Sequence, residues 1–307
     1  MFAKAFKSEF FRISKMKSTY ILPAVLVVIV LITNFIYMAV DLYGLMGFSR
    51  EDVEAIQQMG TSAEGYEESF MSGFQAGINS TENMQADSEF VILGEGPFYD
   101  EAVSAIYTLD VGSLHEILLL AIFVGLYIGN IYSTGLDKNL NIFAGKRVLL
   151  YGVRMLMISL YALVLHVFTW FSSILSAAWM GAGVDLGIDK AFILYFLITW
   201  LLTIAFGSIV ASMTHFTRSK AAGITLGVLL SAGLLSTIMS IASLMIQRKF
   251  DLDGSFNLGN YTVTQNLAVM NLDSDGHFVV RTIVCALVYF VLTYLSGLLV
   301  IRKRDIA

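Results

Sequence analysis

Few residues in this sequence have types and spacings that could do chemistry. His115 and Glu116 are adjacent, so on a helix their side chains would point about 100° apart rather than at one metal ion. Two interpretations remain open for this pair: a polar interface, or a gate at the mouth of a pathway. His166 is the only histidine deep within an apolar stretch. It is either hydrogen-bonded by a neighbouring helix or catalytic, and with Glu116 it is a candidate pathway residue.

Other catalytic motifs are missing. Gly145-Lys146-Arg147 lacks the Ser or Thr that follows Lys in a phosphate-binding loop, and Leu140 stands where that motif begins with Gly. No Gly-x-Ser-x-Gly elbow and no His-Glu-x-x-His zinc motif occurs. The single cysteine, Cys285, cannot form an internal disulfide. We therefore expect no enzyme activity, no metal and no cofactor in this chain.

The composition indicates lipid rather than water as the solvent. Of the 307 residues, 57% are hydrophobic and 14% are charged, against about 25% charged in soluble domains. Six stretches approach or exceed the roughly 20 apolar residues that a spanning helix needs: 20–41, 114–133, 150–181, 191–214, 221–246 and 279–301. We expect an all-α membrane protein with about six transmembrane helices.

The first stretch raises the alternative of a cleaved signal peptide. Its basic leader fits, but its apolar core is longer than the 7–15 residues of a signal sequence, roughly. We expect an uncleaved span. Five polar side chains inside the spans are expected to make interhelical hydrogen bonds: Asn34, Asn130, Ser172, Ser173 and Thr199. The span centres hold no carboxylate, which disfavours an ion-coupled carrier.

The charge distribution predicts the orientation. Most of the 19 Lys and Arg residues lie near the N-terminus, between spans two and three, between spans four and five, and at the C-terminus. Between Asp41 and Asp110, by contrast, Arg50 is the only basic residue. Because positive charge marks the cytoplasmic side, both termini are expected in the cytoplasm.

The segments outside the spans have distinct characters. Residues 1–19 alternate Lys and Arg with Phe and Ile, which predicts an interfacial helix, with a solvated basic leader as the alternative. Residues 42–112 are too long for a simple connection and predict an external subdomain, either a sensing element or a structural lid. Residues 247–278 form a second external loop, 134–149 a cytoplasmic coupling segment, and 302–307 a cytoplasmic tail.

The coupling segment carries a resemblance. An amphipathic stretch from Leu136 to Phe143 is ended by Gly145, and Lys146-Arg147 open the next span. With Gly135, Lys138 and Asn139, this pattern resembles the permease subunits of ABC-2 type ATP-binding cassette exporters. The turn at 215–220 resembles that family's second cytoplasmic contact, and the ending at 301–306 resembles its basic-then-Asp-Ile tail.

The resemblance implies an exporter permease of the cell membrane, expected to be bacterial, that moves an amphipathic peptide, drug or lipid-like substrate outward. Antimicrobial-peptide resistance is a frequent role in the family. A separate ATP-binding subunit would hold ATP and Mg, and a second permease chain would complete a homo- or heterodimer in the lipid. The resemblance implies that ten residues dock the ATPase: Leu136, Asp137, Lys138, Asn139, Phe143, Gly145, Lys146, Arg147, Arg218 and Lys220.

A second hypothesis stays open. The chain could be a non-transporting membrane module, a sensor or assembly factor, whose external domain binds a ligand. That hypothesis predicts no ATPase partner. Neither hypothesis involves nucleic acid.

Overall fold

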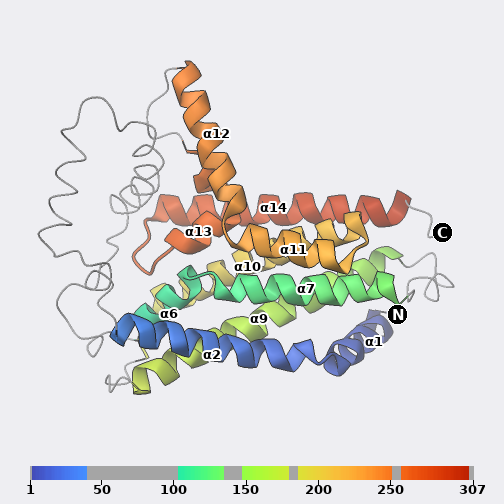
Figure 1. The fold of residues 1–307 in the computed structure, drawn as a ribbon, viewed down its shortest axis with the longest axis horizontal. Helices are drawn as coiled ribbons and strands as arrows, with labels where there is room; N and C mark the ends of the chain where they lie inside the picture. Colours follow the sequence, from blue (N-terminus) through green and yellow to red (C-terminus); the bar gives the residue numbers. More distant parts are fainter. Residues whose placement is uncertain (1, 40–102, 135–146, 180–185, 251–256, 304–307) are drawn as a thin grey trace, which may run out of the picture.

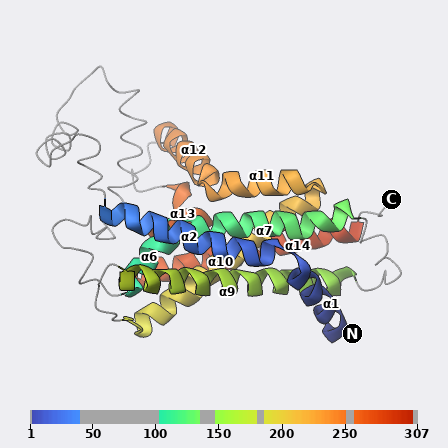
Figure 2. The same cartoon turned by 60° about the horizontal axis from the view of Figure 1, so that its bottom comes forward.

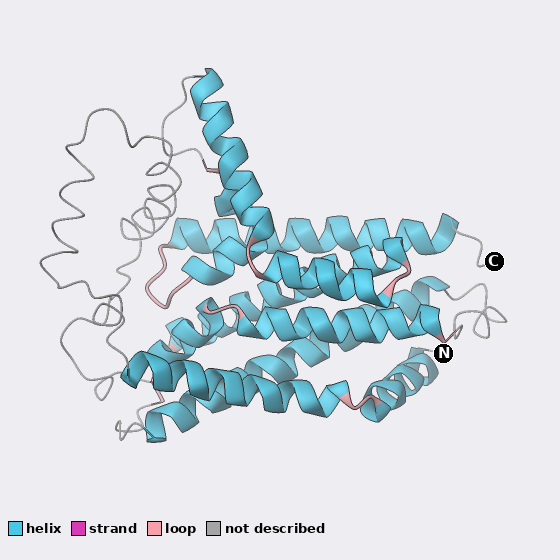
Figure 3. Ribbon diagram, viewed as in Figure 1, coloured by secondary structure: helices cyan, strands magenta, loops and turns pink. Residues whose placement is uncertain are grey.

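The structure is a computed structural model that describes residues 2–39, 103–134, 147–179, 186–250 and 257–303. Every regular element in this part of the chain is a helix, and no strand occurs among these residues (Figure 3). The expectation of an all-α protein is therefore confirmed for the described residues. Most of the predicted subdomain at 42–112 and of the coupling segment at 134–149 lies outside them.

Five described helices are long and apolar enough to cross a membrane. They are α2 (Ser18–Ala39), α7 (His115–Ser133), α9 (Arg147–Trp179), α10 (Lys190–Thr217) and α14 (Gly276–Lys303). The shorter elements are α1 (Phe2–Lys15), α6 (Val103–Gly112), α11 (Lys220–Ser231), α12 (Leu234–Phe250), the 3-10 helix η3 (Leu258–Tyr261) and α13 (Val263–Val269). The multi-pass helical character expected from the sequence is thus present.

The fifth predicted span, 221–246, is not one straight helix. It divides into α11 and α12, whose axes differ by 55° across a short break. Gly233 lies in the break with a φ of 81°, a backbone conformation that side chains other than glycine rarely adopt. Figure 1 shows α12 turning away from the bundle, and Figure 2 shows the same departure from a second angle. Counting the bent pair as one span gives six spans.

Helix α7 forms the centre of the bundle, because α2, α9, α10 and α11 all pack against it. Phe123, Tyr127 and Ile128 on this helix are fully buried. Glycine permits the closest of these contacts. A Cβ atom on Gly129 would lie 2.6 Å from the Cα of Lys220, so only glycine lets α11 approach this closely.

The described helices alternate in direction, so their ends gather at two poles. Helix α1, the C-terminal end of α14 and the turn between α10 and α11 lie at one pole, where both chain termini are found (Figure 1). We call it the termini pole. The opposite, distal pole holds α6, α13 and the outer end of α2. At this pole α13 packs against α6, α10 and α14, and Thr282 donates a 3.0 Å hydrogen bond to Asn266.

Candidate functional site

A buried acid-base pair joins three of the long helices. Glu116, in the first turn of α7, and His166, in α9, are 2% and 0% exposed. The His166 Nδ1 atom lies 2.7 Å from both carboxyl oxygens of Glu116, and its Nε2 atom lies 2.9 Å from the Thr199 hydroxyl of α10. The structure therefore brings two of the three candidate pathway residues together. It also satisfies His166 through neighbouring helices, as one of the two interpretations expected.

His115 is not part of this pair. Its Nδ1 atom lies 2.7 Å from the hydroxyl of Ser113, in the short break between α6 and α7, and the residue is only partly buried. Leu114 in the same break has a positive φ of 62°, which turns the chain sharply from one helix into the next. His115 thus belongs to this turn, while its neighbour Glu116 points into the bundle.

A second buried carboxyl lies beside the first. Asp110 of α6 is 3% exposed. Its Oδ2 atom lies 2.5 Å from the Ser173 hydroxyl and accepts a hydrogen bond from Asn34 at 3.3 Å, and Asn34 also donates to Ser176 at 3.0 Å. The interhelical hydrogen bonds expected of Asn34, Ser173 and Thr199 are therefore confirmed. Ser172 instead donates to Phe168 of its own helix.

The two carboxyl groups are linked along one face of α9. That face presents polar side chains at spacings of three, four and three residues, which follow the helical repeat. We call the whole set the polar ladder: Asn34, Asp110, Glu116, His166, Thr169, Ser173, Ser176 and Thr199. Sequence reasoning missed Asp110 as a member because its partners come from helices distant in the sequence. The sequence feature that could have indicated it is an acidic residue between two apolar ones, Leu109 and Val111.

A third buried carboxylate holds α1 to the bundle at the termini pole. Glu9 is 3% exposed, and its Oε1 atom accepts a 3.1 Å hydrogen bond from Arg154 Nε. Its Oε2 atom accepts a 2.9 Å bond from the Tyr127 hydroxyl and lies 2.8 Å from Arg12. An arginine near the end of a span can reach the lipid headgroups, but Arg154 does not. The residue is 3% exposed because a carboxylate within the bundle offers it a charge-assisted bond.

The termini pole also contains an aromatic junction, made by Tyr132 of α7, Tyr151 of α9, His215 of α10 and Tyr294 of α14. The Tyr132 hydroxyl lies 2.5 Å from His215 Nδ1. The Tyr151 ring meets His215 edge to face with ring centroids 5.4 Å apart, and Tyr294 packs on Tyr151 at 5.1 Å. His215 and Tyr151 are both fully buried. The junction thus joins α7, α9, α10 and α14 to one another near the termini pole.

The two segments predicted to dock an ATPase both leave from this junction. Residues 135–146 lie between Tyr132 and Tyr151 in the chain, and the α10–α11 turn begins three residues after His215. That turn is sharply defined. Arg218 caps α10 with a positive φ of 52°, and the Ser219 side chain accepts a hydrogen bond from Ala222 N at the start of α11.

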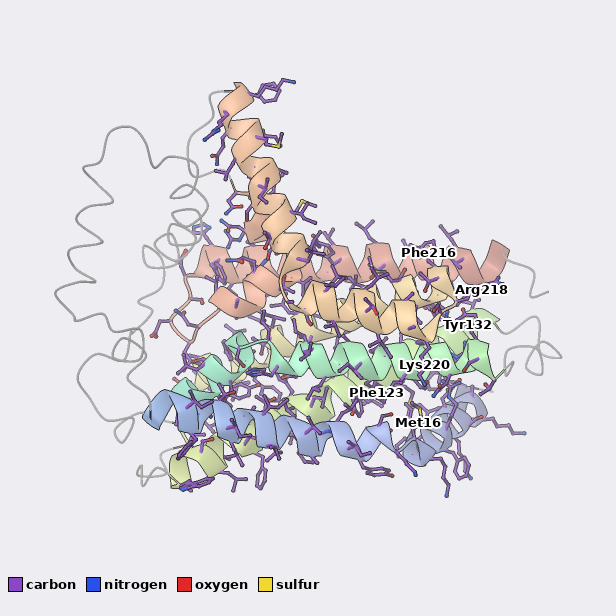
Figure 4. The ribbon with its side chains drawn as sticks, viewed as in Figure 1. Met16, Phe123, Tyr132, Phe216, Arg218 and Lys220 are labelled. Carbon is purple, nitrogen blue, oxygen red and sulfur yellow. The ribbon has the colours of Figure 1, made fainter. Side chains whose placement is uncertain are left out.

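Three of the ten predicted docking residues fall within the described part of the chain. Arg218 and Lys220 are exposed, and Figure 4 shows them with Tyr132 and Phe216 at the termini pole. Arg147 begins α9, and nothing is described of its side chain. The other seven lie outside the described residues: Leu136, Asp137, Lys138, Asn139, Phe143, Gly145 and Lys146.

No family model matches the chain, and no curated protein matches it. Its described residues contain no group of three or more His, Cys, Asp or Glu side chains that could hold a metal ion. Two arrangements therefore carry the functional interpretation. One is the exposed basic turn above the aromatic junction at the termini pole. The other is the buried polar ladder towards the distal pole.

Proposed function

We propose that this chain is the transmembrane permease subunit of an ATP-driven exporter of the ABC-2 type. It would lie in the cell membrane with both termini in the cytoplasm and pair with a second permease chain. A separate ATP-binding subunit would drive it to move an amphipathic peptide, drug or lipid-like substrate outward. The observation that carries the proposal is the aromatic junction, which connects the helix ends flanking both predicted docking segments.

The junction suits the transmission of force. An ATPase pushing on the 135–146 segment would act on the end of α7 and the start of α9 together. Because Tyr132 and Tyr151 both contact His215, a displacement of the end of α7 or the start of α9 would also displace α10. Protein interiors are close-packed and pass such displacements on rather than absorb them. The contact of Tyr151 with Tyr294 extends the same path to α14.

The buried ion pair between Glu9 and Arg154 supports the same interpretation. Arg154 lies two turns into α9, beyond the predicted docking segment, and binds Glu9 of α1. A movement of α9 would therefore carry the N-terminal helix with it. Exposed lysines at this pole, Lys4 and Lys7 on α1 and Lys220 on α11, give it the positive charge expected of a cytoplasmic face.

Copurification tests the proposal. The chain is expressed with each ATP-binding subunit encoded by the same organism, solubilised in mild detergent and purified. We expect an ATP-binding protein to copurify with the wild type and to be lost from the double variant Arg218→Glu, Lys220→Glu. Lys190→Glu, an exposed lysine at the start of α10 and the other end of that helix, is the matched control and should retain the partner.

Two results would overturn the proposal. If no ATP-binding protein copurifies with the wild type in any pairing, the chain is better explained as a sensor or assembly module. If the partner stays bound equally to the wild type and to the Arg218, Lys220 variant, then this turn is not the docking surface. Far-ultraviolet circular dichroism of each variant checks that its helices remain folded.

A further inference from the structure

The polar ladder has an unbalanced charge. Its single basic side chain among the described residues, His166, is engaged by Glu116 at 2.7 Å. Among the described residues, the groups within hydrogen-bond distance of the Asp110 carboxyl are the neutral side chains of Ser173 and Asn34. No ion pair to Asp110 occurs in the described part of the chain. An ionised carboxylate buried without a cation is strongly disfavoured, so a carboxyl in this position tends to take up a proton.

The hydrogen bonds of Ser173 agree with a proton on Asp110. A serine hydroxyl has one hydrogen, yet the Ser173 oxygen lies 2.5 Å from Asp110 Oδ2 and 3.1 Å from the main-chain oxygen of Thr169. A carboxylate and a carbonyl oxygen can both only accept, so one contact would lack a hydrogen if Asp110 were ionised. If Asp110 carries the proton, it donates to Ser173, and Ser173 donates to Thr169. Both contacts are then satisfied.

Glu116 differs from Asp110 because His166 Nδ1 lies 2.7 Å from both its carboxyl oxygens. The Thr169 hydroxyl, 3.3 Å from Glu116 Oε2, can therefore donate to the Leu165 main-chain oxygen at 3.1 Å. The Thr199 hydroxyl donates to the Tyr195 main-chain oxygen at 2.8 Å, so its oxygen is available to accept from His166 Nε2. His166 Nδ1 then donates to the Glu116 carboxylate. The pair is neutral as a unit whichever of its two members holds the proton between them. One added proton on Asp110 therefore makes the whole ladder neutral.

We propose that the polar ladder is a proton-binding site, with Asp110 as the group that binds the proton and whose occupancy holds α6 against α2 and α9. Asp110 reaches both neighbours, through Asn34 of α2 and Ser173 of α9. Loss of the proton leaves a negative charge in this contact, which favours the entry of water and the release of α6. Since α6 is the last part of the predicted external segment, the site would respond to protons from that side.

The surrounding groups favour the neutral form. Burial raises the pKa of the Asp110 carboxyl to about 7, and the hydrogen bonds from Ser173 and Asn34 offset only part of this increase. The titratable side chains within or beside the ladder are Tyr107 of α6, His115 and Glu116 of α7, His166 of α9, and Tyr195 of α10. Helix α13 contributes no titratable side chain, and Tyr20 of α2 is an exposed residue in the first turn of that helix, far along it from Asn34.

The pH dependence has a defined sign. The folded-state pKa of about 7 lies above the ordinary value of 3.8, so the fold prefers protonated Asp110. The stabilising effect of this proton is complete below pH 3.8. It is lost progressively as the pH rises towards 7, and no further loss is expected at higher pH. Asp110→Asn keeps the size of the side chain and cannot titrate, so it should remove this dependence.

The test measures the melting temperature of the full chain in lipid nanodiscs between pH 5 and 8.5. We expect the wild type to lose stability relative to Asp110→Asn as the pH rises, with the difference levelling off above pH 7. Asp273→Asn, an exposed aspartate before α14, is the control and should follow the wild type. A difference between wild type and Asp110→Asn that stays constant with pH would overturn the proposal.

An infrared measurement covers the case in which Asp110→Asn does not fold. The wild-type difference spectrum between pH 5.5 and 8.5 should contain the C=O band of a protonated carboxyl in a dry site, and Ser173→Ala should shift that band. Absence of the band, or a band that Ser173→Ala leaves unmoved, would contradict the proposal. The proposal would also be contradicted if sodium, but not choline, raised the melting temperature at pH 8.5. That result would indicate that the site binds a metal cation.

Discussion

Arg154 donates a hydrogen bond from Nε to Oε1 of Glu9 across 3.1 Å, although 145 residues separate the two in the sequence. Both side chains are buried, and Tyr127 and Arg12 complete the surroundings of the carboxylate. This contact fastens the N-terminal helix to the centre of the bundle. It also shows that α1 is held by a specific charge pair as well as by its apolar side chains.

The first prediction concerns this pair. Glu9→Gln removes the carboxylate that faces the buried Arg154, and breaking a buried pair in this way costs about 3–5 kcal/mol. The double variant Glu9→Leu, Arg154→Met should recover much of this loss, because neither charge then remains buried. Chemical unfolding in detergent micelles measures both. Lys7→Gln, an exposed change on the same helix, should be close to neutral. If Glu9→Gln and Lys7→Gln change the free energy of unfolding equally, the Glu9–Arg154 pair does not hold α1 to the bundle.

The second prediction concerns His166. His166→Leu leaves Glu116 without the ring that contacts both its carboxyl oxygens, so we expect a loss of about 3–5 kcal/mol. Adding Glu116→Leu to that variant should restore part of the stability. His115→Leu changes the neighbouring, partly buried histidine and should have a much smaller effect. If His166→Leu is as mild as His115→Leu, the ring is not held as the structure shows.

The third prediction concerns the contact between α7 and α11. A Cβ atom added at Gly129 would lie 2.6 Å from the Cα of Lys220, and backbone cannot move aside as a side chain can. We expect Gly129→Ala to destabilise the chain by about 1–3 kcal/mol through overpacking. Gly276→Ala is the control, since a Cβ there meets nothing within 4 Å. Similar melting temperatures for the two variants would show that α11 does not pack this closely.

The fourth prediction separates binding from transmission at the aromatic junction and rests on the proposed function. Tyr132→Phe removes the hydroxyl that bonds His215 and should cost about 0.5–1.5 kcal/mol of stability. The ATP-binding partner should still copurify, because the exposed turn at Arg218 is unchanged. ATP-driven transport by the complex should fall relative to wild type. A complex that transports normally would show that the bond is structural only.

The spans themselves could be predicted from sequence because their signal is local. Apolar runs of spanning length identify α2, α7, α9, α10 and α14, and the exposed Lys4, Lys7 and Lys220 lie at the termini pole. The bend of the fifth span was not predicted. A glycine inside a helical pattern is usually tolerated, and only the positive φ of Gly233 shows that the helix breaks there.

The buried polar contacts were the least predictable features. Asn34, Ser173 and Thr199 were expected to bond other helices, but their partners could not be named from one sequence. Glu9 was missed altogether, although it is the only acid in the basic leader and lies four residues before the buried Ile13 on the same helix face. Which side chains meet across helices depends on packing that hydropathy does not encode.

Site-specific photo-crosslinking in cells shows whether the turn at Lys220 contacts an ATP-binding subunit. A photoreactive amino acid replaces Lys220 in one strain and Lys190 in another, and the proteins crosslinked to each chain are identified by mass spectrometry. The exporter account predicts that position 220, and not position 190, captures a protein with an ATP-binding motif. The absence of such a protein at position 220, or its equal capture at both positions, would contradict the account.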